Sequence, residues 1–247
     1  MQPPPLHVVT GATRGIGRAV ALELTSRGLP VIAVGRALTH LESLAEAAGA
    51  LLTGIQANLA TEAGIERVRS SIPPQSQIGG IVHAAGSLVP LEPYAELNPL
   101  ELVEHFRIHV ATPIALFNTL RQQHAIKRIL FIDSYSASAA RLGWSAYSIV
   151  KAAAQMAARC AAQELLPTRS IRAYPGAVNT QIVDAVLASN TDTAHKFAEM
   201  KKKGEFAEPA AVAKFLTALL VDATDEELNE REVFDYNNAE DRAKFTG

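Results

Sequence analysis

Short apolar runs alternate with longer amphipathic stretches along the chain. The apolar runs have the length and the polar flanks of buried strands, and they are Leu6–Thr10, Val31–Val34, Leu51–Gln56, Gly80–His83, Arg128–Asp133, Ile171–Tyr174 and Arg231–Tyr236. The stretches between them are long enough for helices that cross from one parallel strand to the next. Seven strands alternating with six helices predict a single-domain α/β fold, in which a doubly wound, seven-stranded parallel sheet is covered on both faces.

The first strand is followed by a glycine-rich turn, Gly11 to Gly17, and then by an amphipathic helix. Ile16, Val20 and Leu24 recur every four positions in that helix, and Gly28 is placed to cap its C-terminus. At such a turn, bare backbone N–H groups and the helix dipole both face a bound phosphate. The glycine spacing differs from the general dinucleotide fingerprint, but the same physics predicts a nucleotide site.

The second predicted strand is followed by Gly35 and Arg36, where a dinucleotide fold contacts the adenosine ribose. A carboxylate at this position holds the ribose hydroxyl of NAD, whereas an arginine accommodates the additional phosphate of NADP. Arg14 is expected on the same side, and two guanidinium groups make a charge-assisted site for one phosphate. The sequence therefore predicts NADP(H) as the cofactor, and the alternative is a pair of solvated arginines.

The region from 129 to 162 combines a strand, a polar turn and a long alanine-rich helix, and it contains three candidate catalytic side chains. Tyr147 and Lys151 are four residues apart, which places them on one helix face, one turn apart. An adjacent cation in a desolvated cleft favours the phenolate form of a phenol, so Tyr147 is a candidate acid or base. Ser134 follows the strand, where catalytic groups of open sheets collect, and its hydroxyl can polarise a substrate oxygen. Taken alone, this spacing is more simply that of an exposed lysine beside a half-buried tyrosine, and the other motifs of the chain favour the catalytic interpretation.

Composition narrows the class of protein. The chain has 247 residues, of which 48% are hydrophobic and 19% charged, as in one globular domain. The net charge of −2 argues against nucleic acid or an anionic membrane as a partner. The single cysteine, Cys160, excludes an internal disulfide framework, and no apolar run approaches the roughly 18 residues that cross a bilayer. With no signal-peptide pattern at the N-terminus, these features predict a soluble, cytoplasmic protein, and no metal site is expected.

Three motifs together resemble the short-chain dehydrogenase/reductase family. They are the turn from Thr10 to Gly17, the set of Ser134, Tyr147 and Lys151, and the segment from Pro175 to Thr180. The resemblance covers nearly the whole chain and implies a Rossmann-type fold that forms one NADP-binding domain over residues 1–247. It also implies that Ser134 orients the substrate carbonyl, that Tyr147 donates the proton and that Lys151 holds the nicotinamide ribose.

The same resemblance assigns the cofactor site. The cofactor-binding residues it implies are Gly11, Thr13, Arg14, Gly15, Ile16, Gly17, Arg36, Asn58, Leu59, Ala84, Ala85, Gly86, Tyr147, Lys151, Pro175, Gly176, Val178 and Thr180. Two positions depart from the family pattern. Asn58 stands where an aspartate often contacts adenine, and an amide can make a similar hydrogen bond. His83-Ala-Ala-Gly86 replaces the usual Asn-Asn-Ala-Gly, so Ala84 cannot make the bonds of that asparagine, and His83 is expected to pack rather than to act.

His109 is a further candidate catalytic residue, because in the family an asparagine stands there at a helix kink. Its main-chain carbonyl holds a water that links the catalytic lysine to solvent. In this chain Pro113 lies four residues further along the predicted helix Pro99–Gln123, and it has no N–H to give the carbonyl of His109. A kink with a freed carbonyl is therefore predicted by another route. The alternative is that His109 only packs.

The resemblance also implies that the region from about 181 to 208 is a lid over the substrate. Its bulky apolar residues would exclude water and hold an apolar substrate, and Lys201–Lys203 are expected to be a solvated face.

The function predicted is NADPH-dependent reduction of a ketone or diketone, with Tyr147 as general acid, and the divergent turn after the fourth strand suggests the sepiapterin reductase and benzil reductase branch. The alternatives are a 3-oxoacyl thioester reductase and a non-catalytic NADP-binding sensor. The small residues of the helix from Tyr147 and the family pattern favour a homodimer.

Overall fold

The computed structural model describes residues 3–86, 88, 91–189 and 192–246, and it contains the predicted sheet. Within these residues the strands are β1 (Leu6–Thr10), β2 (Val31–Gly35), β3 (Leu52–Gln56), β4 (Ile78–His83), β5 (Arg128–Ile132), β6 (Arg169–Tyr174) and β7 (Phe234–Asp235). They form one seven-stranded parallel sheet in the order β3-β2-β1-β4-β5-β6-β7. The order reverses between β1 and β4, and ligands of α/β sheets bind outside the carboxyl ends of the strands at such a point.

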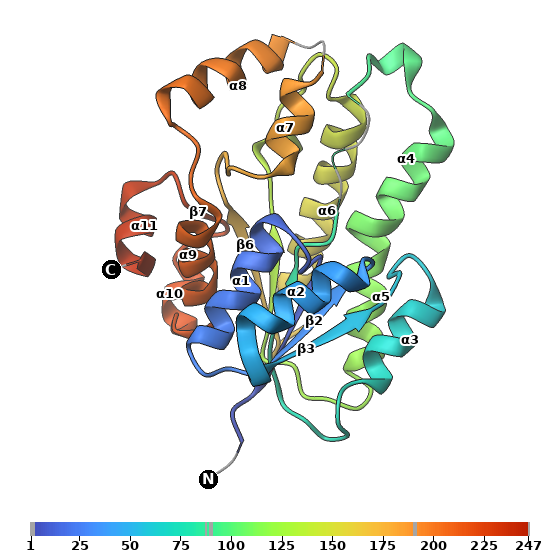
Figure 1. The fold of residues 1–247 in the computed structure, drawn as a ribbon, viewed down its shortest axis with the longest axis vertical. Coiled ribbons are helices and arrows are strands. Elements are labelled where there is room, and N and C mark those ends of the chain that lie inside the picture. The colour runs from blue at the N-terminus through green and yellow to red at the C-terminus, as the bar shows by residue number, and fades with distance from the viewer. Residues whose placement is uncertain (1–2, 87, 89–90, 190–191, 247) are drawn as a thin grey trace.

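Helices cover both faces of the sheet (Figure 1). In the described part of the chain they are α1 (Gly15–Ser26), α2 (Leu38–Ala48), α3 (Glu62–Ser70), α4 (Pro99–Phe106), α5 (Thr112–Leu120), α6 (Ser145–Glu164), α7 (Gln181–Leu187), α8 (Asp192–Lys203), α9 (Pro209–Val221), α10 (Asp225–Asn229) and α11 (Ala239–Thr246). Gly28 has a φ of 76° just beyond α1, which confirms the predicted cap. None of the described helices is both long enough and apolar enough to cross a membrane.

The core lies in two layers, one on each face of the sheet. Val9 of β1 packs in one layer with residues of α1, α2 and α9, whereas its neighbour Val8 packs in the other with residues of α3 and α5. Neighbouring strand residues point to opposite faces, so a strand covered on both faces must be apolar throughout. This is why unbroken apolar runs predicted the central strands correctly.

The described residues form eleven α-helices rather than the six predicted, because short helices also occur beyond β6 and β7, and two predicted elements have different bounds. β7 covers only Phe234–Asp235 rather than the run that begins at Arg231, because the guanidinium of Arg231 pairs with Asp241 of α11 at 2.6 Å and Asp241 also accepts from the N–H of Asp235. The helix predicted as continuous over Pro99–Gln123 is also interrupted. A π-helical segment, Arg107–Ala111, separates α4 from α5, so the irregularity expected near Pro113 is present.

Two buried histidines belong to the central strands. His7 begins the buried part of β1 and is 2% exposed, and His83 ends β4 and is 7% exposed. Burial lowers the pKa of His7 to about 4. Burial, helped by the positive charge of Lys151, lowers the pKa of His83 to about 4. Both imidazoles are therefore neutral in the folded protein at neutral pH.

Stability should fall as the solution is acidified. Each ring has a pKa of 6.5 when unfolded and about 4 when folded, so the stabilising difference is complete above about pH 6.5 and is lost toward pH 4. The expected loss of unfolding free energy is about 3 kcal/mol for each ring. His7→Leu should make the pH dependence shallower in urea denaturation series. The exposed His40 offers the control, because His40→Leu replaces a histidine without removing a buried ring. An unchanged slope in His7→Leu would contradict the expectation.

Candidate active site

The glycine-rich turn packs tightly against the end of β4. Gly11 has a φ of 64°, and a Cβ on it would lie 2.6 Å from the carbonyl oxygen of Ala84. A Cβ on Gly17 would lie 2.4 Å from the carbonyl oxygen of Gly11. A side chain would clash at both positions, so only glycine fits there. The backbones of the turn and of the Ala84 segment can therefore approach closely, and they form a cradle at the N-terminus of α1. The bond from the N–H of Ala85 to the Thr10 hydroxyl, at 3.2 Å, ties the Ala84 segment to β1 although Ala84 has no polar side chain.

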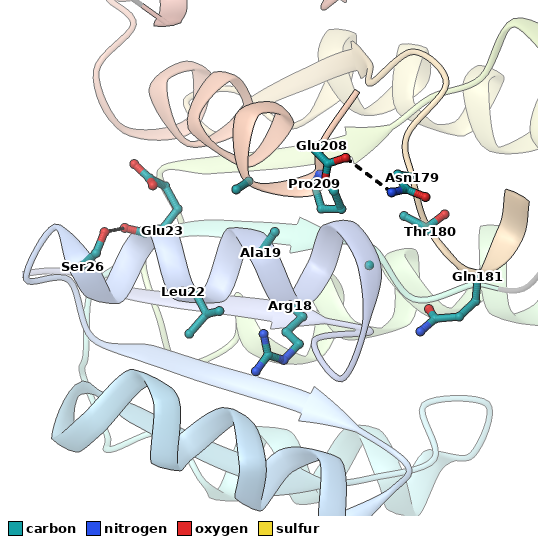
Figure 2. A pocket seen from close by; sticks show the side chains of 12 residues that line it. Arg18, Ala19, Leu22, Glu23, Ser26, Asn179, Thr180, Gln181, Glu208 and Pro209 are labelled. Carbon is teal, nitrogen blue, oxygen red and sulfur yellow. Dashed lines mark hydrogen bonds between the residues drawn. The ribbon is translucent and has the colours of Figure 1, made fainter. Parts of the chain in front are cut away.

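The other wall of the cradle comes from the chain after β6. Thr180 is the N-cap residue of α7, and a Cβ on Gly15 would lie 3.2 Å from its methyl carbon. Gly15 and Thr180 both line a groove of about 540 Å³ between α1 and the start of α9. Figure 2 shows this groove, in which Asn179 donates to Glu208 at 3.4 Å. The predicted turn from Pro175 to Thr180 therefore faces the glycine-rich turn.

Other predicted cofactor residues lie on the two segments that form this cradle. A Cβ on Gly35 would lie 2.3 Å from the methyl carbon of Thr13, so the turn also packs on the end of β2. Arg14 is the N-cap residue of α1, and Ile16 packs against the core. Val178 bridges to Ala207, and Gly176 has a φ of 74°.

Arg36 lies in a separate pocket of about 400 Å³ at the ends of β2 and β3. Asn58 lines the same pocket, and the buried Leu59 follows it. A second guanidinium at this pocket belongs to Arg67 of α3, whose Nη1 donates to the carbonyl of Gln56 at 3.4 Å. Sequence reasoning missed Arg67. The only indication in the sequence of a role for Arg67 is that it lies one helix turn beyond Gly64. At Gly64, α3 approaches the backbone of Asn58 closely.

The three candidate catalytic side chains lie on segments that come together at the carboxyl end of β5. The ammonium of Lys151 lies 5.8 Å from the centre of the Tyr147 ring, as their spacing on α6 predicted. Lys151 also donates to the carbonyl of Ile132 at 3.0 Å, two residues before Ser134. The Ser134 hydroxyl oxygen accepts from the N–H of Ser136 at 3.2 Å, which leaves its proton to point to a substrate oxygen.

A buried ion pair lies directly behind Ser134. Asp133 accepts two hydrogen bonds from the guanidinium of Arg172, at 2.8 and 3.0 Å, and both side chains are almost fully buried. The other carboxylate oxygen of Asp133 accepts from the N–H of Ser134 at 2.7 Å. Arg172 also pairs with Glu232 at 2.8 Å. The network fixes the backbone of Ser134, and nothing in the sequence pattern indicated it.

An aromatic row connects Tyr147 to the predicted lid. Trp144 packs edge-on against Tyr147, with ring centres 5.7 Å apart, and stacks on Phe197 of α8 at 6.3 Å. Phe197 stacks in turn on Phe206 at 5.5 Å. In Figure 1, α7 and α8 lie at the top of the molecule, near the upper end of α6. Tyr147 therefore has an apolar neighbour on the side of the predicted lid.

His109 lies in the π segment and packs over the turn after β4. A Cβ on Gly86 would lie 2.3 Å from the His109 ring, so glycine is required there. The ring also stacks on His105, with centres 6.5 Å apart. His83, which sequence reasoning set aside, makes a hydrogen bond to the carbonyl of Ile108 in the same segment.

Comparison with known proteins agrees with this geometry. Residues 6–191 match the family model for short chain dehydrogenases, which is more than half of the chain. The chain belongs to the short-chain dehydrogenase/reductase family of oxidoreductases. That family uses NAD(H) or NADP(H), and the resemblance found in the sequence motifs is confirmed.

Curated relatives span almost the full chain. Benzil reductase ((S)-benzoin forming) of Bacillus subtilis is 27% identical, over 89% of this chain and 95% of its own length. Sepiapterin reductase of Xenopus laevis is 29% identical, over 88% and 91%. The 3-oxoacyl acyl-carrier-protein reductase of Aquifex aeolicus is 30% identical, over 87% and 89%.

Solved structures share the fold. A short-chain dehydrogenase/reductase from Saccharomyces cerevisiae superposes with a TM-score of 0.87 at 20% identity, covering 98% of this chain and all of its own. A serine dehydrogenase complexed with NADP+ superposes with a TM-score of 0.71 at 21% identity, covering 84% and 86%.

Proposed function

We propose that this protein is an NADPH-dependent carbonyl reductase that acts on a ketone or diketone, with Tyr147 as the general acid. The position of Lys151, which contacts both the Tyr147 ring and the end of β5 just before Ser134, carries the proposal. The glycine cradle supports a dinucleotide, because Gly11 and Gly17 leave backbone N–H groups within reach of a phosphate. A bound NADPH would supply the hydride.

The side chains divide the remaining work. The hydroxyl of Ser134 donates a hydrogen bond to the substrate carbonyl oxygen and holds that oxygen next to Tyr147. Tyr147 gives its proton to the same oxygen as negative charge develops there. The ammonium of Lys151, above the ring, stabilises the phenolate that remains. Asp133, which accepts from the backbone of Ser134, keeps the serine in place.

Two observations favour a compact apolar substrate over a carrier-bound thioester. Trp144 and Phe197 line the lid side of Tyr147, and they suit an aromatic or alkyl group. The lysine run, which could attract an acyl-carrier phosphate, already has acidic partners. Lys201 lies 3.6 Å from Asp184, Lys202 2.7 Å from Glu199, and Lys203 3.9 Å from Glu205. We propose that residues 181–208 form the lid.

A substrate screen separates the candidate functions. The purified protein should oxidise NADPH with small diketones such as benzil and give no comparable rate with 3-oxoacyl thioesters. Turnover of thioesters alone would support the alternative reductase. NADPH binding without turnover of any carbonyl compound would support the sensor.

Cofactor preference should follow Arg36. Arg36→Asp removes the cation that faces the additional phosphate and introduces a ribose acceptor, so the preference should move toward NADH by at least about tenfold in kcat/KM. Arg69 of α3 is the control, because its guanidinium pairs with Glu66, and Arg69→Gln should not change the ratio. Equal use of NADH and NADPH by the unmodified protein would contradict the NADP assignment.

We also propose a homodimer, formed through α4 and α6. Apolar side chains on these helices are exposed, with Leu100 at 77%, Val103 at 54%, Ile149 at 42% and Met156 at 53%. Pairing these faces would bury them. Light scattering at micromolar concentration should show the mass of two chains, and Val103→Glu should reduce it to one. A monomer in the unmodified protein would count against this assembly.

A further inference from the structure

The carbonyl of Ile108 has lost both backbone donors that a helix would give it. Its α-helical donor is the N–H of Thr112, but in the π register that N–H donates to Arg107. The donor one residue further along is Pro113, which has no N–H. The sequence predicted that Pro113 would leave the carbonyl of His109 without a backbone donor. In the π register, Pro113 also leaves the carbonyl of Ile108 without one. A carbonyl left without a donor away from water is costly.

His83 supplies the missing donor from the end of β4. Its Nε2 lies 3.1 Å from the Ile108 carbonyl oxygen, and because a carbonyl only accepts, Nε2 carries the proton. Nδ1 lies 3.1 Å from the hydroxyl oxygen of Thr10, and it accepts the hydroxyl proton. The Thr10 oxygen accepts in turn from the N–H of Ala85. One neutral ring thus connects β1, the turn after β4 and the π segment.

We propose that His83 is a positioning residue for the reaction, which fixes the π segment between the glycine cradle and the helix of the catalytic tyrosine. The segment packs against α6, which carries Tyr147 and Lys151, and its own His109 lies on Gly86. On the other side, the backbone of Ala84 lies against Gly11. A shift of the π segment would therefore move the turn beside the cofactor cradle and the packing of α6 together.

Two amide substitutions test each end of the ring separately. The amide nitrogen of glutamine can take the place of Nε2, whereas that of asparagine reaches only as far as Nδ1. His83→Gln should keep the donor to Ile108 and leave kcat/KM within a few-fold. His83→Asn should lose that donor and lower kcat/KM by about tenfold to a hundredfold, the scale of a small misplacement in an active site. It should also speed hydrogen exchange of the amides at 107–112, measured by mass spectrometry.

His124 is the matched control, because it is also buried and its Nδ1 lies 3.1 Å from a backbone carbonyl, that of Ser76. His124→Leu should destabilise the protein without changing exchange at 107–112 or kcat/KM. Equal effects of His83→Asn and His83→Gln, or a loss of kcat/KM in His124→Leu like that in His83→Asn, would overturn the proposal.

Two measurements test the proposal even if the variant does not fold or the proposed function is wrong. If His83→Asn does not fold, the nitrogen chemical shifts of His83 in the unmodified protein decide: a proton on Nε2 is expected at neutral pH, and a proton on Nδ1 alone overturns the proposal. The kinetic comparison rests on the proposed function. The exchange comparison needs no substrate, so an inactive protein with faster exchange in His83→Asn would reject the function and support the positioning role.

Discussion

Tyr147→Phe is expected to lower turnover by about two to four decades, the usual contribution of a general acid, while leaving the fold and NADPH binding intact. In the proposed mechanism the phenol gives the proton, and the phenyl ring that remains in the variant still packs on Trp144. The measurement is kcat with a diketone, beside a fluorescence titration of NADPH.

Tyr94 provides the control for this substitution. Its side chain is 75% exposed, so Tyr94→Phe should change neither kcat nor NADPH affinity. More than about a tenth of the activity remaining in Tyr147→Phe would mean that another group delivers the proton.

Arg172→Met is expected to cost about 3–5 kcal/mol of unfolding free energy, because it leaves the buried carboxylate of Asp133 without its partner. Activity should fall as well, since Asp133 holds the backbone N–H of Ser134. Urea denaturation measures the loss. Replacing both partners, as Asp133→Asn with Arg172→Met, should recover much of the stability, because no uncompensated charge remains and the amide oxygen still accepts from Ser134.

An exposed ion pair gives the comparison. Arg27 pairs with Asp222 at 2.6 Å on the surface, and Arg27→Met should cost no more than about 1 kcal/mol. If Arg172→Met were equally mild, the buried carboxylate of Asp133 would not depend on Arg172 to compensate its charge.

Local patterns in the sequence predicted the central sheet and the catalytic helix. Buried parallel strands must be apolar throughout, so Val31–Gly35 and its neighbours were visible as unbroken runs. The spacing of Tyr147 and Lys151 places them together on any helix. The glycine-rich turn can be recognised from three glycines alone. Each of these features depends on residues that are close in sequence.

Features that depend on distant residues were not predicted. The hydrogen bond from His83 depends on Pro113 and the π register, which release a carbonyl 25 residues away in the sequence, and no local pattern contains that information. The pair of Asp133 and Arg172 joins two neighbouring strands, in which a charged residue is more simply expected at an exposed position. The shortening of β7 follows from Arg231 and its ion pair with α11. In each case a tertiary contact decided the outcome.

Transfer of the hydride itself tests the central claim most directly. The protein should be incubated with benzil and NADPH that carries deuterium at the transferring position of the nicotinamide, and the alcohol analysed by mass spectrometry. We expect a hydroxy ketone with one deuterium on the carbinol carbon, formed by the unmodified protein and nearly absent with Tyr147→Phe. An unlabelled alcohol, or no alcohol from any diketone or ketone although the cofactor binds, would contradict it.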